Sequence, residues 1–509
     1  MIILLHSVCL SGLEAHLVTL EIDVSNGMPA FNVVGLTDTA IQESKERVRA
    51  AIKNSEYKFP QTRITVNLAP ADLRKKGPLY DLPIALGIIS GECGFDEALL
   101  KESLFVGECS LDGSIRGVHG ILPAALFARS IGKKYLFVPE ENAKEASMVP
   151  DISVIAISNL KQAVSYLTKE KALEFVLPVN IFEIIKKDKE KMDRYDLSHI
   201  IGQDHAKRAL TIAAAGGHNI LLEGPPGSGK TLLAKSFETL LPDLNFDEMI
   251  EVSKIYSVAG KLEKGSSLVT TRPMRTIHHS ASTVSVIGGG RDSRPGEISL
   301  AHKGVLFLDE FLEFDSNLLE TLRQPLEDGE ITINRINASY TYPAKFVLIG
   351  AMNPCPCGYL GDRSKQCVCS PTTIERYRKK LSGPIMDRID LMIRVPRVLE
   401  SDLQSKSEGR KTSEEYRREI DKARERQLKR FSGTKKTFNS EMENKDLETI
   451  LNIHPDAEAF LLSAVTRLDL STRVYYRLKK LSRTIADLAD SDQILLPHVA
   501  EALSYRVSN

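Results

Sequence analysis

The first third of the chain shows short segments in which apolar and polar residues alternate. Residues 17–24 and 64–68 alternate in this way, as strands with one buried face do. Between them, residues 40–54 carry Ile41, Val48 and Ile52 at helical spacing among charged residues, which predicts an amphipathic helix. We therefore expect an α+β domain over residues 1–170.

The middle of the chain has a different hydrophobic pattern. Residues 305–308 and 346–350 are continuous apolar runs, typical of strands buried on both faces, and helix-like segments separate such runs. Strands that alternate with helices predict an α/β core with a parallel sheet over residues 196–396.

The C-terminal region is predicted to be helical throughout. Apolar residues recur at helical spacing over 457–468 and 475–488, so we expect an all-helical lid over residues 413–509. The charge-dense residues 183–195 favour a linker over 171–195, either solvated chain or an exposed helix end. Residues 397–412 are expected to connect core and lid.

Composition narrows the partners and the compartment. The 67 basic and 67 acidic residues give a formal net charge of +0, so any nucleic-acid surface must be local. No window approaches the roughly 20 apolar residues that span a bilayer, which predicts no membrane partner. The apolar start of the chain has no basic flank, and there are seven cysteines, so we expect a cytoplasmic protein.

A glycine-rich loop carries the clearest chemistry. It has the pattern GxxxxGK[ST], placed directly after the apolar residues 219–222 and before a helix-prone stretch. Such a loop points backbone N–H groups at phosphates, its lysine adds charge and its hydroxyl reaches magnesium. A chance match is the alternative, but strand, loop and helix follow in the required order. The predicted ATP-binding residues are Gly224, Pro225, Pro226, Gly227, Ser228, Gly229, Lys230 and Thr231.

Polar residues end the two apolar runs of the core. Asp309 and Glu310 follow residues 305–308; we expect Asp309, with Thr231, to support magnesium and Glu310 to orient or deprotonate a water. Asn353 follows the second run and could hold the same water. Alternatively, the acidic pair caps a strand and Asn353 is a turn residue.

Two arginines are candidates for neutralising the charge on a γ-phosphate. Arg388 lies in the sequence Asp-Arg-Ile-Asp, and Arg483 lies on a predicted lid helix. An arginine from a neighbouring subunit could supply this charge in an assembled ring. Either residue could instead form a surface ion pair.

In this order, these motifs resemble AAA+ ATPases of the magnesium-chelatase-like group. Residues 67–73, 351–358 and 483–488 resemble the YifB/ComM family more closely, and the resemblance spans nearly the whole chain. It implies that Asp309 and Glu310 form Walker B, that Asn353 is sensor 1, that Arg388 is a trans-acting finger and that Arg483 is sensor 2. It also implies a homo-oligomeric ring, a hexamer, that works on DNA with recombination or DNA-uptake proteins.

Two insertions resemble elements that line the pore in helicase relatives. Residues 272–302 are rich in glycine and small polar residues, and residues 329–346 read as a hairpin. Arg335 lies at the hairpin tip, and we hypothesise that it contacts nucleic-acid phosphates. The alternative is a hairpin that only packs against a neighbouring subunit.

The N-terminal domain resembles the proteolytic domain of Lon-type proteases. A serine–lysine dyad needs a hydroxyl nucleophile and an amine base, but the corresponding positions hold Leu79 and Leu122. We therefore expect an inactive protease fold and an enzyme that is not a protease.

Four of the seven cysteines lie close together in the sequence. Cys355, Cys357, Cys367 and Cys369 form two CxC pairs, nine residues apart. Four thiolates suit tetrahedral zinc, although CxC is tighter than the usual zinc spacing. Reduced thiols and redox-sensitive pairs are the alternatives.

The leading function is an ATP-driven motor on DNA, with the helicase or branch-migration activity that the resemblance to ComM implies for recombination or natural transformation. The alternatives are a chelatase-like subunit, a protein-remodelling ATPase and a regulatory module whose ATPase controls assembly.

Overall fold

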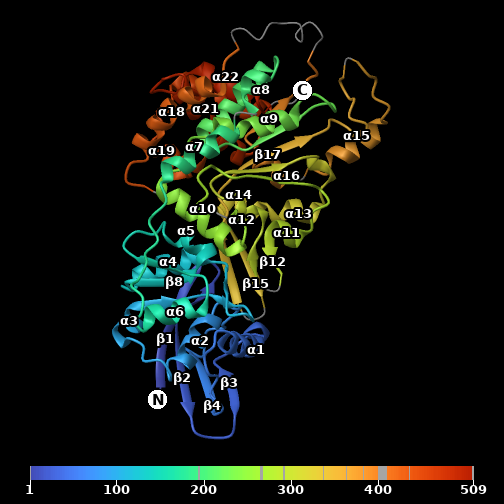
Figure 1. Ribbon diagram of the computed structural model, residues 1–509. Helices are drawn as coiled ribbons and strands as arrows, with labels where there is room; N and C mark the ends of the chain where they lie inside the picture. The colour runs from blue at the N-terminus through green and yellow to red at the C-terminus, as the bar shows by residue number, and fades with distance from the viewer. Residues whose placement is uncertain are drawn as a thin grey trace. The chain divides into compact units, whose positions relative to one another are not determined.

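The computed structural model describes residues 2–192, 195–263, 267–290, 293–335, 338–362, 364–381, 383–398, 410–434 and 436–506. These residues divide into two compact units (Figure 1). The first comprises Met1–Glu183 and Phe246–Val269, and the second comprises Ile184–Asn245 and Thr270–Asn509. Helix α7 (Ile181–Met192) covers about half of the expected linker 171–195 and contains the boundary between the units. The finer division into a core, a connector and a lid stays a prediction.

The first unit is a mixture of strands and helices. Its strands are β1 (Ile2–Ser11), β2 (Glu14–Ser25), β3 (Ala30–Val34), β4 (Arg63–Ala69), β5 (Ser103–Phe105), β6 (Glu108–Cys109), β7 (Ile115–Arg116), β8 (Tyr135–Pro139) and β9 (Ser153–Ile157). Its helices include α1 (Thr39–Asn54), α2 (Asp81–Ile89), α3 (Glu97–Glu102), α4 (Ile121–Ser130), α5 (Ala143–Ala146) and α6 (Leu160–Leu167). One sheet has the order β1-β2-β4-β3 and another the order β5-β8-β9.

Local sequence explains the first of these helices. Helix α1 starts after Asp38, whose side chain accepts a hydrogen bond from the backbone N–H of Ile41 at 3.0 Å, as an N-cap residue does. Ile41, Val48 and Ile52 are buried on one face. The expected helix is therefore confirmed, and so are the expected strands, which are β2 and β4.

Helix α10 (Phe246–Ala259) belongs to the first unit, although it lies in the sequence between elements of the second. It packs against α4 (Figure 1). The N–H of Gly120 donates to the backbone oxygen of Ser257 at 3.1 Å, and the Ser257 hydroxyl donates to the carboxylate of Glu145. The residues after α10 continue this packing, because Leu268 is buried in the same apolar cluster as Leu122.

The second unit is built on a parallel sheet. Its strands are β10 (Ile220–Glu223), β11 (Met274–Ile277), β14 (Val305–Leu308), β17 (Val347–Met352) and β18 (Leu391–Arg394). The order is β11-β14-β17-β10-β18, and each neighbouring pair is parallel. Every residue of β10, β14 and β17 is buried, as the continuous apolar runs predict. The expected parallel α/β core is therefore confirmed.

Helices and two hairpins complete this unit. The helices are α8 (Asp204–Gly216), α9 (Lys230–Ser236), α11 (Thr283–Ile287), α12 (Glu297–Leu300), α13 (Ser316–Thr321), α14 (Arg323–Asp328), α15 (Pro371–Arg378), α16 (Gly383–Met386), α18 (Ser413–Arg430), α19 (Asn444–Thr449), α20 (Pro455–Arg467), α21 (Thr472–Leu488) and α22 (Leu496–Ser504). One hairpin joins β12 (Gly288–Gly289) to β13 (Arg294–Pro295), and the other joins β15 (Glu330–Arg335) to β16 (Ala338–Pro343).

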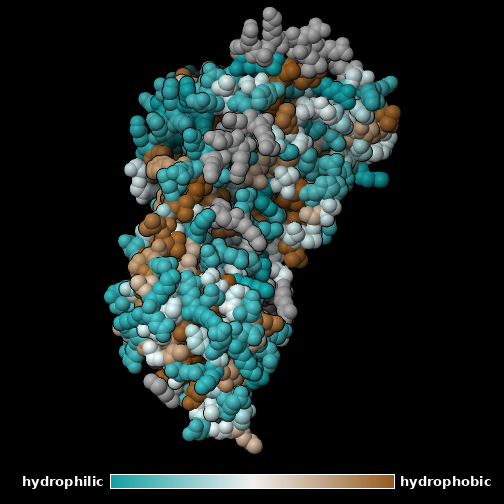
Figure 2. Space-filling view, in the orientation of Figure 1, coloured by the Kyte–Doolittle hydropathy of each residue, from teal (hydrophilic) through white to brown (hydrophobic). Residues whose placement is uncertain are grey.

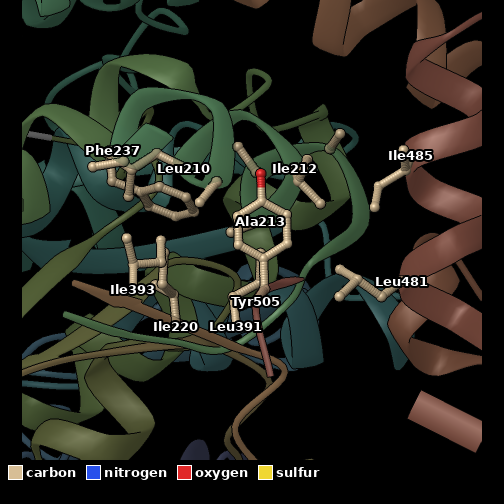
Figure 3. Close-up of a cluster of buried hydrophobic side chains, with 14 of the residues drawn as sticks. Leu210, Ile212, Ala213, Ile220, Phe237, Leu391, Ile393, Leu481, Ile485 and Tyr505 are labelled. Carbon is tan, nitrogen blue, oxygen red and sulfur yellow. The ribbon is translucent and has the colours of Figure 1, made fainter. Parts of the chain in front are cut away.

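The helical C-terminal region and the sheet share one hydrophobic core. Figure 3 shows Leu481 and Ile485 of α21 near Ala213 of α8, with Leu391 of β18 in the same cluster. Burying each such leucine or isoleucine contributes about 1.5–3 kcal/mol. The helices after residue 410 are therefore packed onto the core by their apolar faces rather than joined to it only by the chain.

The face drawn in Figure 2 is mostly hydrophilic, with scattered hydrophobic patches. Among the described residues, no helix combines the length and the apolar character that crossing a membrane requires.

Candidate nucleotide-binding site

The glycine-rich loop curls between β10 and α9 in the way that its sequence predicts. Gly227 and Gly229 have φ angles of 78° and 89°, which L side chains rarely adopt. Gly224 is required for another reason, because a Cβ there would lie 2.3 Å from the backbone oxygen of Val395. Helix α9 begins at Lys230, so its N-terminus faces the loop.

The amino group of Lys230 lies inside this loop. It donates to the backbone oxygens of Gly224 at 2.6 Å and Pro225 at 2.9 Å, and it lies 3.3 Å from Oδ1 of Asn353. Burial lowers the pKa of Lys230, while the carboxylate of Asp309 opposes that change. A buried ammonium held by neutral oxygens, in a loop of glycines with left-handed backbone, fits an anion such as a phosphate.

The acidic residues lie at the same edge of the sheet. The hydroxyl of Thr231 donates to Oδ2 of Asp309 at 3.0 Å, which brings together the two side chains predicted to support magnesium. Glu310 has a φ of 54°, and its Oε2 lies 2.9 Å from Nδ1 of His279. Sequence reasoning missed His279, and its position two residues after the end of β11, the strand beside β14, was the available signal.

The site therefore joins four of the predicted residues through observed contacts. Asp309 follows β14, Asn353 follows β17, and Lys230 and Thr231 come after the loop that follows β10. All four lie at the carboxyl ends of these strands, because β10, β14 and β17 are parallel neighbours. Glu310 follows Asp309 directly, and its backbone N–H donates to the Asp309 carboxylate at 3.0 Å.

Arg388 lies at the opposite ends of the strands, where the parallel strands β10 and β18 begin. It precedes β18, whose Leu391 pairs with Ile220 at the start of β10, whereas the glycine-rich loop follows the end of β10. Four residues of strand span about 13 Å. Arg388 is only 3% exposed and pairs with Glu327 of α14. The structure thus does not bring it to the phosphate loop of its own chain.

A second arginine joins this pair. Arg473, near the start of α21, binds the other carboxylate oxygen of Glu327 at 2.8 Å. Burial acts to raise the pKa of Glu327, but Arg388, followed by Arg473 and Arg477, outweighs burial and lowers it. Sequence reasoning missed Arg473; a basic residue two positions after the Ser471 cap of α21 was the signal.

Arg483 lies inside the helical region, 1% exposed. Its guanidinium donates to Asp487 at 2.9 Å and to the backbone oxygens of Ser491 and Asp492. Among the described residues, these contacts are with the helical region and do not include the phosphate loop. The sensor 2 role of Arg483 stays a prediction.

Arg335 is the last residue of β15 and pairs in register with Ala338 of β16. Its backbone therefore lies at the end of the hairpin, as predicted, whereas the contact with nucleic acid stays untested. The other insertion packs near the base of this hairpin: the Tyr342 hydroxyl donates to the backbone oxygen of Ser293 at 2.7 Å. Figure 1 shows β12 and β15 close together.

Leu79 and Leu122 pack into the same apolar cluster of the first unit. Leu122 is fully buried, and its backbone N–H donates to Glu145 at 2.9 Å. The two aliphatic side chains contribute to the core there. The resemblance of this unit to the Lon proteolytic domain stays a prediction.

A phosphate loop at the carboxyl edge of a parallel sheet, with acidic residues at the end of a nearby strand, defines a P-loop nucleotide-binding fold. Models of three families match the chain. They are magnesium chelatase, subunit ChlI, over residues 196–403; subunit ChlI of Mg-chelatase over residues 20–142; and magnesium chelatase, subunit ChlI C-terminal, over residues 410–506.

Individual relatives agree with these matches. Competence protein ComM of Haemophilus influenzae is 44% identical over 499 residues, covering 97% of this chain and 95% of the relative. YifB of Escherichia coli is 39% identical over 504 residues, covering 99% of this chain and 96% of the relative. Magnesium-chelatase subunit ChlI of Nephroselmis olivacea is 27% identical over 31% of this chain and 52% of its own length. The chain belongs to the YifB/ComM family of magnesium-chelatase-like proteins.

Proposed function

We propose that the chain is an ATP-hydrolysing ring motor that moves or remodels DNA. The observation that carries the proposal is the contact of Lys230 with Asn353 and of Thr231 with Asp309 at one edge of the sheet. Family membership implies an ATPase. A nucleotide-binding fold of this kind hydrolyses ATP when a carboxylate is available to orient water, and we assign this role to the carboxylate of Glu310.

Each residue has a role in this proposal. Lys230 and the loop N–H groups bind the β- and γ-phosphates of ATP, and Thr231 and Asp309 hold magnesium, which neutralises phosphate charge when bound. Glu310 takes the proton of the attacking water, and Asn353 orients that water. His279 fixes the Glu310 carboxylate through their 2.9 Å contact.

The position of Arg388 supports the proposal of a ring. Its edge of the sheet is remote from the phosphate loop of the same chain, so a γ-phosphate that it contacts must belong to another subunit. We propose a homo-oligomeric ring, with six subunits as the family resemblance implies, in which Arg388 leaves Glu327 and completes the neighbour's site. We assign Arg473 to the same interface as Arg388, because the guanidiniums of both residues bind the carboxylate of Glu327.

DNA is the proposed substrate for two reasons. The relative that is 44% identical carries the name of a competence protein, and the Arg335 hairpin ends in a basic residue suited to phosphate contact. We place the activity in the cytoplasm, with recombination or DNA-uptake proteins as partners. An Arg335→Glu variant is expected to lose DNA binding while it retains basal ATP hydrolysis; unchanged DNA binding would contradict the role of Arg335.

A branched-DNA assay tests the motor directly. The protein and ATP are added to a labelled four-way junction, and the appearance of separated duplex products is followed on a native gel. The expected result is ATP-dependent separation by the wild type and none by Glu310→Gln, which retains the binding residues. ATP hydrolysis without any movement of DNA would favour a regulatory ATPase.

A chelatase-like subunit is the second candidate. The models that match are those of magnesium chelatase subunits, which is the specific observation in its favour. That function needs partner subunits, and porphyrin metallation with candidate partners would reveal it. A protein-remodelling ATPase would instead be stimulated by an unfolded protein.

A further inference from the structure

The four clustered cysteines converge in space. Their Sγ atoms all lie within 4.8 Å of one another. The Sγ atom of Cys355 lies 3.4 Å from that of Cys357 and 3.7 Å from that of Cys367, and the last two lie 3.6 Å apart. The two CxC pairs, which the sequence separates by nine residues, thus meet at one point.

These separations match one tetrahedral metal ion. Zinc–thiolate bonds of about 2.3 Å place the sulfurs of a tetrahedral site about 3.8 Å apart. A disulfide would need about 2.05 Å between sulfurs, far less than any distance here. The short CxC spacing therefore does not prevent the four sulfurs from lying close enough to bind one metal ion.

Backbone N–H groups support the sulfurs. The N–H of Cys369 lies 3.4 Å from Sγ of Cys367. Backbone groups of Tyr359 and Val368 also hydrogen-bond to the Cys357 side chain. Donors that surround thiolates in this way orient the ligands of a metal site.

We propose that Cys355, Cys357, Cys367 and Cys369 bind one zinc ion, and that this ion holds the loop between them against the phosphate loop. Cys355 is fully buried and follows Asn353 by two residues, so the site is anchored at the end of β17. Zinc is favoured over harder cations because all four ligands are thiolates.

Two contacts connect the cysteine loop to the phosphate loop. Gly358 has a φ of 83°, and a Cβ on it would lie 2.6 Å from Cδ of Pro226. Arg397 pairs with Asp362 of the cysteine loop at 3.0 Å and donates to the backbone oxygen of Pro226 at 3.2 Å. Loss of the ion would therefore loosen both Pro226 and Asn353.

Metal analysis tests the site without reference to ATP. Protein purified without chelators is expected to contain about one zinc per chain by mass spectrometry of the metal, and all seven cysteines should titrate as thiols after chelation in denaturant. Less than about half an equivalent of zinc, iron in its place, or missing thiols because of disulfides would overturn the proposal.

Matched variants locate the metal. Cys367→Ser combined with Cys369→Ser should abolish zinc binding, whereas Cys93→Ser should leave it unchanged because Cys93 lies outside the cluster. If the double variant does not fold, Cys369→His provides the alternative, since it keeps four ligands and should retain the metal. Zinc in the double variant at the wild-type level would overturn the assignment.

The link to the nucleotide rests on the proposed ATP site and is measured separately. Binding of a fluorescent ATP analogue should weaken on the order of tenfold when zinc is removed and recover when zinc is returned. Unchanged affinity with a full loss of zinc would remove the coupling and leave the metal site standing. Failure of the zinc-loaded protein to bind the analogue would instead contradict the proposed function.

Discussion

The guanidinium of Arg388 forms an ion pair with the carboxylate of Glu327 in the same chain, at the edge of the sheet opposite the phosphate loop. The pair gives a buried arginine a charge partner within its own chain. In the proposed ring, a neighbour's phosphates would replace the carboxylate, and the site would then depend on assembly.

Subunit mixing tests this arrangement. Arg388→Ala should lower the ATPase rate of the assembled protein by roughly 10³-fold, because a transition-state charge is left unneutralised. Lys230→Ala should also be inactive. A one-to-one mixture should regain activity, since about a quarter of the interfaces in a randomly mixed ring then have both residues. A mixture no more active than its parents would contradict action between subunits.

Two of the three arginines of α21, Arg473 and Arg483, should behave differently. Arg483→Ala removes a buried cation bound to Asp487 and should cost about 2–4 kcal/mol in free energy of unfolding. Arg473, whose side chain is 46% exposed, should change stability by less than about 0.5 kcal/mol when replaced by alanine, but should lower the ATPase rate. Urea unfolding and ATPase rates check both; the reverse pattern would support the sensor role predicted for Arg483.

Asp390 joins the helical region to the sheet. It binds Arg477 of α21 at 2.7 Å and the backbone N–H of Asn219 at 3.0 Å. Asp390→Asn should cost about 3–5 kcal/mol at neutral pH, because it leaves Arg477 without its buried partner. The measurement is the free energy of unfolding in urea.

The pH dependence of this effect has a definite sign. Burial acts to raise the pKa of Asp390, but Arg477 and His218 outweigh it and hold the pKa below its ordinary value. A depressed folded-state pKa gives stability that is present above about pH 4 and lost on further acidification. The difference between wild type and variant should shrink below about pH 4; a difference that grows there would contradict this assignment.

Glu238 provides the opposite case. Burial raises its pKa to about 7, so its ionisation in the folded state costs free energy. Stability should decline as pH rises from about 4.5 toward about 7, and Glu238→Gln should remove about 2 kcal/mol of that decline. Urea midpoints of both proteins at about pH 5 and about pH 8 check this, with Asp247→Asn, an exposed neighbour in sequence, as the control. Equal declines in wild type and Gln variant would contradict it.

Sequence patterns predicted the sheet and most of the site because both follow from local rules. The buried strand 305–308 fixes where Asp309 lies, and parallel neighbours bring Asn353 to the same edge. The contact partners of Arg388 and Arg483 do not follow from such rules. The partner of Arg388 depends on the end of the strands at which the residue lies. The partners of Arg483 depend on how the helices of the C-terminal region pack.

The position of α10 could not be predicted for a related reason. An apolar helix face is equally satisfied by its own sheet or by another domain, so its pattern alone does not select the partner. The cysteine spacing likewise does not reveal that the four sulfurs lie together; the geometry of the loop brings them within 4.8 Å of one another.

The central claim is that ATP hydrolysis in this chain is used on DNA. The most direct measurement is the steady-state ATPase rate of the wild type alone and with branched, single-stranded or duplex DNA, with Glu310→Gln as the inactive control. We expect that at least one DNA structure increases the ATPase rate, and that Arg335→Glu removes this increase while keeping the basal ATPase rate. A basal rate that no DNA structure changes would contradict the claim.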